Sequence, residues 1–349
     1  MGNPLVSINL LLYKPGFYLK PCLDSVLAQT YKNIELLIID NNSADGTADE
    51  AKKIIAQVQN SGVATPTCRL LENKENLGFS AGHNLGIKES RGDLVFLLNQ
   101  DIILEADFLK NAVAIFGKDK QIGAVQGKLL RLKIDGESLI KTQIIDNAGL
   151  VFLKNRRIIA RGQGQRDSGK FSQPEEIFAI DGAAPIYRRA ALEDIKICLD
   201  EKCEYLDEDF YMYKEDVDLA WRLRLAGWKA YYEPMAVAWH ARTAGDSAAT
   251  NYFDIIRERR KIGSFGKYHS FKNQRLMQIK NEQPAILLKH LPWFLPKEIA
   301  SWAFVILFER YTWKAIKELF RQASKAWQKR KIIMAWKKAG NKEMERWFK

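Results

Sequence analysis

Histidine and cysteine are scarce in this chain of 349 residues, which has four of each. A zinc cluster needs closely spaced soft ligands, and the four cysteines are scattered with no CxxC pair. The composition therefore argues against a zinc cluster. It favours four reduced thiols in a cytoplasmic protein, at Cys22, Cys68, Cys198 and Cys203.

Long apolar runs are also lacking. The longest, residues 299–308, is about half of the roughly 20 residues that a membrane-spanning helix requires. The N-terminus has no basic stretch followed by an apolar one, so we expect no signal peptide. We also expect no helix that spans a membrane.

Positive charge is concentrated at one end of the chain, whose formal net charge is +12. Residues 251–349 hold 23 Lys and Arg against 8 Asp and Glu, which leaves 31 against 34 for residues 1–250. Such asymmetry indicates an anionic partner for the last hundred residues: a membrane surface, a lipid-linked phosphate or a nucleic acid.

The first hundred residues alternate apolar strands with amphipathic helices. We predict strands over 5–12, 34–40, 68–71 and 93–98, with helices over 17–29 and from Asp45 to Gln59. Strands that are apolar on both faces and alternate with helices indicate a mostly parallel sheet covered on both sides. Ligands of such sheets lie beyond the carboxyl ends of the strands.

Polar residues stand at two of these strand ends. Asp40 and Asn42 follow the second strand, and Asn99 and Asp101 follow the fourth. A carboxylate in this position can hold Mg²⁺ or Mn²⁺, because hard cations prefer oxygen ligands. The structural alternative is a turn or a helix cap, where Asp and Asn are also favoured.

A glycine-spaced loop leads into a helix at Asn76, Gly78 and Asn84. Glycines allow the backbone to approach a nucleotide closely, and a helix N-terminus favours negative charge. The spacing is neither a Walker loop nor a GxGxxG fingerprint, so the loop alone is a weak indication of nucleotide binding.

Acidic residues begin a predicted helix over 215–227, and arginines occupy its last turns. The helix N-terminus keeps Asp216 ionised, as suits a carboxylate that accepts a proton from a hydroxyl. The alternative is that Glu215 and Asp216 are there only because acidic residues favour first turns. His240 follows another apparent strand, and it is of interest only if the fold brings it near Asp101.

Taken together and in order, these segments resemble the family 2 glycosyltransferases, and within them the rhamnosyltransferase-like group. The resemblance extends from Val6 to about Ser247. It is carried by Tyr13, residues 40–43, 76–86, 91–93, 97–101, 182–183, 188–189, 207–208, 213–219 and 222–228, and His240 with Gly245 and Ser247. It implies a GT-A fold, in which a Rossmann-like nucleotide half and an acceptor half share one sheet.

The resemblance also implies roles for single residues. Asp40 contacts the nucleoside base, and Asp101 is the last acid of a metal-binding D-x-D. His240 is a further metal ligand, Asp216 is the general base, and Glu215 supports the acceptor or orients the base. The remaining residues on the donor side are Asn42, Asn76, Gly78, Asn84 and Asn99.

Three positions depart from the family pattern. Asn99 replaces the first acid of D-x-D, so the metal depends more on the donor diphosphate. His83 and Lys14 stand where Asn is frequent, which leaves the details of the nucleoside loop open.

The implied function is inverting, metal-assisted sugar transfer with Mg²⁺ or Mn²⁺ as cofactor. The family subgroup makes dTDP-L-rhamnose the first donor to test, ahead of UDP-sugars. The acceptor is a glycan or a lipid-linked saccharide in cell-surface polysaccharide synthesis. The competing hypothesis is a non-catalytic nucleotide-sugar-binding protein, which need not keep Asp101, Asp216 and His240 together.

We expect a catalytic domain over 1–250, with a nucleotide-sugar half over about 1–120 and an acceptor half over about 121–250. A basic helical extension follows over 251–349. Its Trp and Leu stripes, rimmed by Lys325, Lys329 and Arg330, suit a helix on the cytoplasmic face of an anionic membrane. The alternative is packing on the catalytic domain or on another subunit. No nucleic-acid-binding module occurs, so we expect no nucleic-acid partner.

Overall fold

The computed structural model describes residues 2–59, 66–136, 138–242, 249 and 251–349. Its central sheet contains β1 (Val6–Leu12), β2 (Ile34–Asp40), β3 (Thr67–Glu72), β4 (Leu94–Asn99), β5 (Ile102–Leu104), β6 (Ile122–Asp135), β7 (Ser138–Asn147), β10 (Glu175–Ile177), β11 (Pro185–Arg188) and β14 (Lys229–His240). The order is β10–β14–β6–β11–β4–β1–β2–β3, with β5 paired to β14 and β7 paired to β6.

The first half of the sheet is parallel, as predicted. β1 pairs in parallel with both β2 and β4, and β2 pairs in parallel with β3. The connecting helices are α1 (Leu19–Leu27) after the short helix η1 (Gly16–Tyr18), α2 (Thr47–Gln59), α3 (Gly78–Glu89) and α4 (Phe108–Phe116). The four predicted strands and the two predicted helices between them are all present.

The second half of the sheet has mixed direction. β11 is antiparallel to both β4 and β6, whereas β14 runs parallel to β6. β5 and β10 pair antiparallel with β14. The predicted helix over 215–227 is α6 (Glu215–Leu225), and Gly227 with φ 86° follows it in the left-handed conformation favoured at this position.

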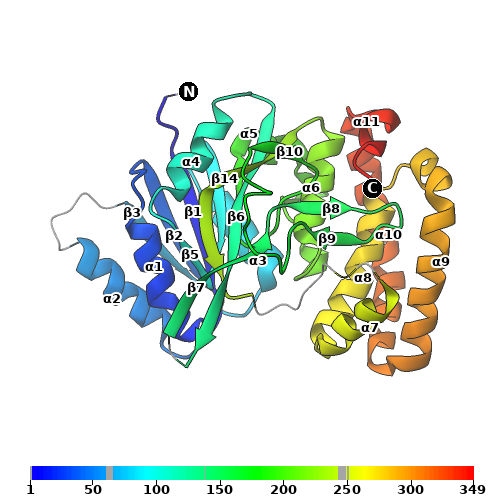
Figure 1. Ribbon diagram of the computed structural model, residues 1–349, viewed down its shortest axis with the longest axis horizontal. Helices are drawn as coiled ribbons and strands as arrows, with labels where there is room; N and C mark the ends of the chain where they lie inside the picture. The colour runs from blue at the N-terminus through cyan, green and yellow to red at the C-terminus, as the bar shows by residue number, and fades with distance from the viewer. Residues whose placement is uncertain (1, 60–65, 137, 243–248, 250) are drawn as a thin grey trace.

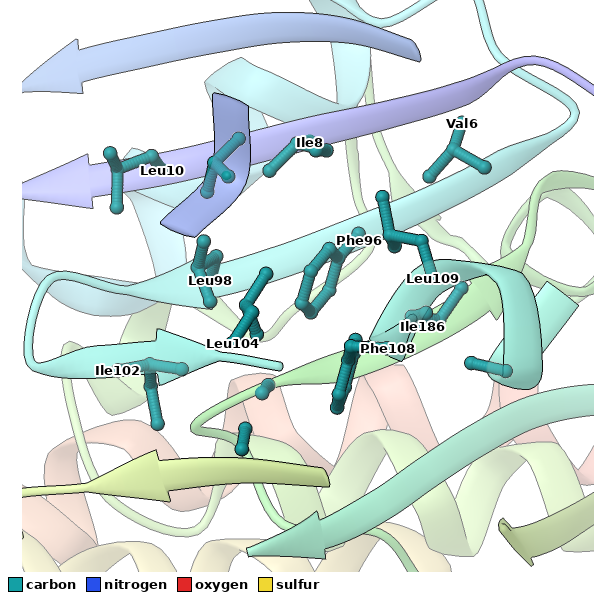
Figure 2. Close-up of a cluster of buried hydrophobic side chains, with 14 of the residues drawn as sticks. Val6, Ile8, Leu10, Phe96, Leu98, Ile102, Leu104, Phe108, Leu109 and Ile186 are labelled. Carbon is teal, nitrogen blue, oxygen red and sulfur yellow. The ribbon is translucent and has the colours of Figure 1, made fainter. Parts of the chain in front are cut away.

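Helices pack on the sheet (Figure 1), and two clusters of buried apolar side chains lie on its two faces. On one face, Val6, Ile8 and Leu10 of β1 point toward the same layer as Phe96 of β4 and Phe108 of α4 (Figure 2). On the other face, Val95 and Leu97 of β4 pack with residues of α3, α6 and α5 (Arg189–Ile195). Alternate side chains of one strand therefore enter opposite layers, as a sheet that is buried on both sides requires.

The last hundred residues form helices that stand together beside the sheet (Figure 1). They are α7 (Tyr252–Lys261), α8 (Ser264–Asn281), α9 (Pro284–Phe308), η3 (Arg310–Thr312), α10 (Trp313–Trp336) and α11 (Asn341–Glu345). Phe348 lies in one buried cluster with Phe152 of β8 (Leu150–Phe152) and Trp221 of α6. The backbone of Lys349 also bonds to Phe152 and Lys154, so the end of the chain is fastened to the hairpin of β8 and β9 (Ile158–Ala160).

Buried ion pairs join these helices to the segment that precedes α6. Lys280 of α8 and Lys329 of α10 both contact the carboxylate of Asp207, and Lys329 also contacts Glu204 at 2.5 Å. Burial alone would raise the pKa of Asp207, but the two ammonium groups outweigh it and lower that pKa. The prediction that Lys329 lies on an exposed rim is wrong, because its side chain is 1% exposed.

The prediction of four reduced thiols is also wrong. Cys198 and Cys203 form a disulfide across the hairpin of β12 (Ile197–Leu199) and β13 (Lys202–Glu204). These two residues lie directly opposite each other in the antiparallel ladder, so strand pairing brings together thiols that the linear spacing leaves apart. Cys22 and Cys68 are free.

The absence of a membrane-length helix was predicted from residues 299–308 alone, but these belong to α9, which has 25 residues. By length and composition, α9 is able to cross a membrane. Its residues 284–298 are less apolar and include Pro292 and Pro296, which is why the run appears short in the sequence.

We predict that Lys329→Met lowers the free energy of unfolding by about 3–5 kcal/mol, because it removes one partner of a buried charge cluster. Lys331→Met is the matched control on the same helix: Lys331 is exposed, so its loss should change stability by no more than about 0.5 kcal/mol. Urea denaturation followed by circular dichroism measures both. Equal stability of the two variants would contradict a structural role for Lys329.

Candidate active site

Parallel pairing brings the predicted polar residues to one edge of the sheet. Leu12 of β1 lies opposite Asp40 of β2, and Leu11 lies opposite Asn99 of β4. The carboxyl ends of β2 and β4 therefore flank the end of β1, where ligands of α/β sheets bind. Gln100 strengthens this edge, since its side-chain amide exchanges hydrogen bonds with the backbone of Tyr13 at 2.7 and 3.0 Å.

Asp40 is buried and held in place by Ser43. The Ser43 hydroxyl donates to Asp40 Oδ1 at 2.5 Å, and the Ser43 backbone N–H lies 3.3 Å from both carboxylate oxygens. The Ser43 hydroxyl also accepts from the backbone N–H of Lys14 at 2.9 Å. Asn42 is exposed and has a positive φ of 61°, so its side chain lies on the open side of this turn.

The glycine-spaced loop is organised by Asn41. Asn41 Nδ2 donates to Asn76 Oδ1 at 2.9 Å and to the carbonyl of Gly78 at 3.1 Å, while Asn41 Oδ1 accepts from the backbone N–H of Leu77. Gly78 has φ +79°, and a Cβ there would lie 2.6 Å from the ring of Tyr211. Glycine is required at this position both by the backbone conformation and by the close approach of the ring.

Asn84 is buried in α3 and faces the segment that precedes α6. Its Nδ2 donates to the carbonyl of Leu206 at 2.8 Å and to Glu208 Oε1 at 3.0 Å, and its Oδ1 accepts from the backbone N–H of Leu206. Both ends of the amide are thus used within the protein. Its direct contact with a donor stays a prediction.

His83, the other departure in this helix, is fully buried against Phe79. Neither ring nitrogen has a hydrogen-bond partner among the described residues. Burial lowers the pKa of His83 to about 3, so the ring is neutral.

Asp101 and His240 lie close together, which is the condition that a shared metal site has to meet. Antiparallel pairing places His240 opposite Ile102, and His240 Nε2 lies 3.5 Å from Asp101 Oδ2. Asp146 of β7 holds the other ring nitrogen, with Nδ1 2.9 Å from its Oδ2. Burial would lower the pKa of His240, but Asp101 and Asp146 outweigh burial and raise it to about 10.

This pair has the spacing of two ligands to a divalent ion, and binding of the ion would displace the proton from His240 Nε2, because a metal-ligating imidazole is neutral. Ligands at roughly 2.1 Å from one ion lie about 3 Å apart, and a carboxylate behind a ligating histidine fixes its orientation. No group of three or more His, Cys, Asp or Glu that could hold a metal ion occurs in the described part of the chain. The donor diphosphate and water can supply the other ligands of such an ion.

Asp216 lies in the first turn of α6 and points toward the sheet edge. Its Oδ2 accepts from the backbone N–H of Gly182 at 3.2 Å, and its Oδ1 from that of Val217 at 2.8 Å. Burial and the nearby carboxylate of Asp181 raise the pKa of Asp216 to about 6, against the opposing charge of Lys214. Asp216 is therefore ionised at neutral pH but close to its titration range.

Glu215, beside it, is in a different state. It is buried, and its Oε2 has no hydrogen-bond partner within the described ranges. Burial and the charge of Asp216 raise the pKa of Glu215 well above its usual value. Burial therefore favours the protonated form of Glu215, while Asp216 is ionised at neutral pH.

A short backbone link joins the two parts of the site. The N–H of Asn99 donates to the carbonyl of Ala183 at 3.0 Å, and the preceding residue, Gly182, donates to Asp216. A Cβ on Gly182 would lie 3.2 Å from that of Asp216, so glycine permits this approach. The fold therefore places the end of β4 and the carboxylate of α6 around one edge.

The sequence analysis missed Asn41, Asp146 and Asp181 as separate contributors. Asn41 was part of the strand-end motif but received no role of its own. Asp146 and Asp181 lie in the mixed strand-like region of the sequence, where only the sheet register brings them to the site. Gly245 and Ser247, which the resemblance includes, lie outside the described residues.

We predict that Asp101→Ala abolishes the rise in melting temperature that Mn²⁺ causes in the presence of a nucleoside diphosphate, and that His240→Ala reduces it. A ligand that binds only the native state raises stability, so the shift reports binding without any turnover. Asp24→Ala, which removes an exposed carboxylate of α1, is the control and should keep the full shift. A full shift in Asp101→Ala would rule out this metal site.

Comparison with known proteins was consistent with this geometry. The family model for glycosyl transferase family 2 matches residues 13–196. The poly-beta-1,6-N-acetyl-D-glucosamine synthases of Staphylococcus aureus and Staphylococcus epidermidis are 28% and 27% identical over 234 residues, 67% of this chain and 49% of each relative. The chain thus spans about half the length of these curated relatives.

Solved structures resemble the fold. GalNAc-T7 with UDP, GalNAc and Mn²⁺ has a TM-score of 0.58 at 14% identity, over 79% of this chain and 48% of that chain. The mannosyltransferase PcManGT of Pyrobaculum calidifontis with GDP-Man and Mn²⁺ has a TM-score of 0.52 at 16% identity, over 95% of this chain and 86% of that chain. TarS of S. aureus with UDP-GlcNAc has a TM-score of 0.53 at 15% identity, over 95% of this chain and 87% of that chain. The predicted GT-A fold class, with a helical C-terminal region, is confirmed.

Proposed function

The chain belongs to glycosyl transferase family 2, and we propose that it is an inverting enzyme that moves a sugar from a nucleoside diphosphate to a hydroxyl of a glycan acceptor. The observation that carries this proposal is the arrangement around one sheet edge. Asp101 and His240 lie together at the ends of β4 and β14, and Asp216 is linked to the end of β4 through Ala183 and Gly182.

The chemistry of the two groups is complementary. Asp216, ionised at neutral pH with a pKa of about 6, takes the proton from the attacking hydroxyl. Burial and the charge of Asp216 raise the pKa of the adjacent Glu215, which favours the protonated form of Glu215. Asp101 and His240 would hold a Mg²⁺ or Mn²⁺ ion, which would supply Lewis-acid stabilisation of the negative charge on the departing diphosphate. Two structural relatives were solved with Mn²⁺, which supports a divalent cation here. One base and no covalent nucleophile lead to inversion at the sugar carbon.

On the donor side, we propose that Asp40 contacts the nucleoside base of the donor. The phosphates of the donor lie at the edge formed by Asn76, Gly78 and Asn99. The rhamnosyltransferase-like pattern makes dTDP-L-rhamnose the first donor to test. The named activities and ligands of the relatives make UDP-N-acetylglucosamine the second. A donor panel measured by thermal shift with and without Mn²⁺ identifies the nucleotide and the sugar.

The acceptor is a growing glycan or lipid-linked saccharide of a cell-envelope polysaccharide, at the cytoplasmic face of the membrane. The relatives that synthesise poly-beta-1,6-N-acetyl-D-glucosamine support this class. The competing function, nucleotide-sugar binding without transfer, does not need an ionised carboxylate at Asp216. Substitution of Asp216 therefore distinguishes sugar transfer from nucleotide-sugar binding without transfer.

We predict that Asp216→Asn lowers turnover by at least about 100-fold, the loss expected for a general base, and leaves donor affinity nearly unchanged. Because the pKa of Asp216 lies above the unfolded value of 3.8, its stability contribution falls as pH rises toward 6. The variant should therefore melt no lower than the parent at pH 7, which separates lost chemistry from lost folding.

In the parent enzyme, turnover should fall as the pH drops below about 6, because protonated Asp216 cannot accept a proton. Asp194→Asn, which alters a partly exposed carboxylate of α5, is the control and should keep the parent profile. Retention of a tenth or more of the turnover in Asp216→Asn would remove it as the base.

The C-terminal helices carry a second surface, which we propose lies on an anionic membrane. Along α9, the exposed side chains are apolar except for Lys289, which pairs with Glu345, whereas α10 exposes both aromatic and basic residues. The exposed apolar residues of this surface are Leu288, Trp293, Leu295, Ile299, Ile306, Leu307, Phe308, Tyr311, Trp313, Phe320 and Trp327. The basic residues are Lys314, Lys317, Arg321, Lys325 and Lys331. Trp and Leu beside lysines are typical of helices that lie in the interface plane.

Contacts of α9 with α8 favour a helix that lies on the membrane over one that crosses it. Glu298 pairs with Arg275 at 2.5 Å, and the Trp302 ring packs edge-on against Phe271. A crossing orientation would separate these groups and leave Arg275 buried without its carboxylate. Because α8 and α10 also carry core residues, truncation would unfold the protein and does not test this surface.

We predict that Leu307→Glu weakens binding to vesicles of anionic phospholipid by about tenfold or more, because burial of a leucine contributes roughly 1.5–3 kcal/mol. Met235→Glu is the matched control: Met235 is 67% exposed on β14, and Leu307 is 66% exposed. Flotation assays at rising salt measure both, and parent binding should fall steeply with salt. Unchanged vesicle binding by the Leu307→Glu variant would contradict the proposed membrane-binding surface. It would not bear on the proposed sugar transfer.

A further inference from the structure

The segment over 206–214 connects the donor loop to the helix that carries Asp216, and it contains a strained turn. Tyr211, Tyr213 and Lys214 have φ values of 64°, 72° and 73°. Residues with side chains avoid this left-handed region unless the surroundings impose it. The turn therefore needs contacts from outside its own sequence.

On one side, the turn touches the donor loop. The carbonyl of Tyr211 accepts from the backbone N–H groups of Phe79 and Ser80 at 2.8 and 3.1 Å, at the start of α3. The ring of Tyr211 occupies the space that a side chain at Gly78 would fill. On its other side, the turn leads directly into Glu215 and Asp216, with Lys214 as the residue before α6.

On its outer side, the turn is held by α8 of the basic C-terminal region. Asn273 is fully buried, and its Nδ2 faces the carbonyl oxygens of Phe210, Met212 and Tyr213 at 2.9, 2.8 and 2.7 Å. His269 stacks on the ring of Tyr211 with 5.4 Å between ring centroids, and its Nδ1 lies 3.1 Å from the carbonyl of Phe210. These are the carbonyls that the left-handed turn leaves without partners in a helix or strand.

We propose that Asn273 is a positioning residue: through the turn over 210–214 it sets the orientation of Asp216 relative to the donor loop. The C-terminal helices are thereby part of the catalytic apparatus as well as a surface for partners. The inference rests on the proposed function, because it assigns to Asn273 an effect on the base of that reaction.

The turn also sets the electrostatic surroundings of Asp216. Asp181 and Tyr187 lie near that carboxylate on neighbouring segments, Glu215 precedes it in α6, and Lys214 is the cation beside it. The charge of Lys214 lowers the pKa of Asp216. Release of the turn moves Lys214 away from Asp216, so the pKa of Asp216 should then rise.

The test compares Asn273→Ala with Gln274→Ala. Gln274 is the next residue of α8 and is also buried, and its Nε2 donates to the carbonyl of Arg156 at 3.0 Å, away from the turn. Both variants lose a buried amide that faces carbonyls, so both should lose stability. Only Asn273→Ala should lower kcat, by about 10- to 100-fold as expected for a misplaced base. The donor KM should change little, because Asn41 still holds the donor loop.

Two further readouts separate positioning from general destabilisation. The acid limb of the pH profile should move to higher pH in Asn273→Ala and stay in place in Gln274→Ala. Hydrogen exchange at the Phe79 and Ser80 amides, which the Tyr211 carbonyl protects, should accelerate only in Asn273→Ala. If Asn273→Ala does not fold, His269→Ala, whose ring is only partly buried, should show the same changes at smaller size.

Equal kcat, equal acid limbs and equal exchange in the Asn273→Ala and Gln274→Ala variants would overturn the inference. Absence of transfer or donor hydrolysis by the parent enzyme would instead refute the proposed function. Exchange at Phe79 and Ser80 still tests the coupling in that case, because it requires no turnover.

Discussion

The pairing of buried carboxylates with lysines from the end of the chain is the constraint on which the acceptor side of this structure depends. Asp218 lies in α6 and Asp207 precedes that helix; both are buried, and an unpaired buried carboxylate is strongly unfavourable. Lys280 lies against both, and Lys329 against Asp207. The uneven distribution of charge along the sequence is thus partly an intramolecular match, in which the basic helices neutralise acids of the catalytic region.

The same constraint connects the two functions proposed for the C-terminal helices. Lysines that point inward fix the segment before Asp216, while those that point outward, such as Lys314 and Lys317, border the apolar surface of α9 and α10. In this proposal, the same helices hold the general base Asp216 in place and bind the enzyme to a membrane that contains its acceptor. Substitutions on the outer face should leave the inner contacts intact.

The sequence was sufficient for features that depend on local order. Strand ends carry Asp40 and Asp101, and parallel pairing of consecutive strands brings them to one edge, so both were predictable. Contacts that depend on antiparallel register or distant helices were not. Asp146 reaches His240 through the register of β7, Cys198 meets Cys203 across a hairpin, and Lys329 reaches Asp207 over more than a hundred residues. In the sequence, each of these residues has the properties of an ordinary surface or strand residue.

The central claim is that one ionised carboxylate, Asp216, activates the attacking hydroxyl in a single displacement. Proton NMR of the sugar released during donor hydrolysis tests this most directly and needs no known acceptor. It uses the donor that gives the largest thermal shift, and spectra are recorded before the anomers equilibrate. The account predicts that the first sugar released has the anomeric configuration opposite to that of the donor. A first product with the configuration of the donor would contradict it, because retention requires a different mechanism.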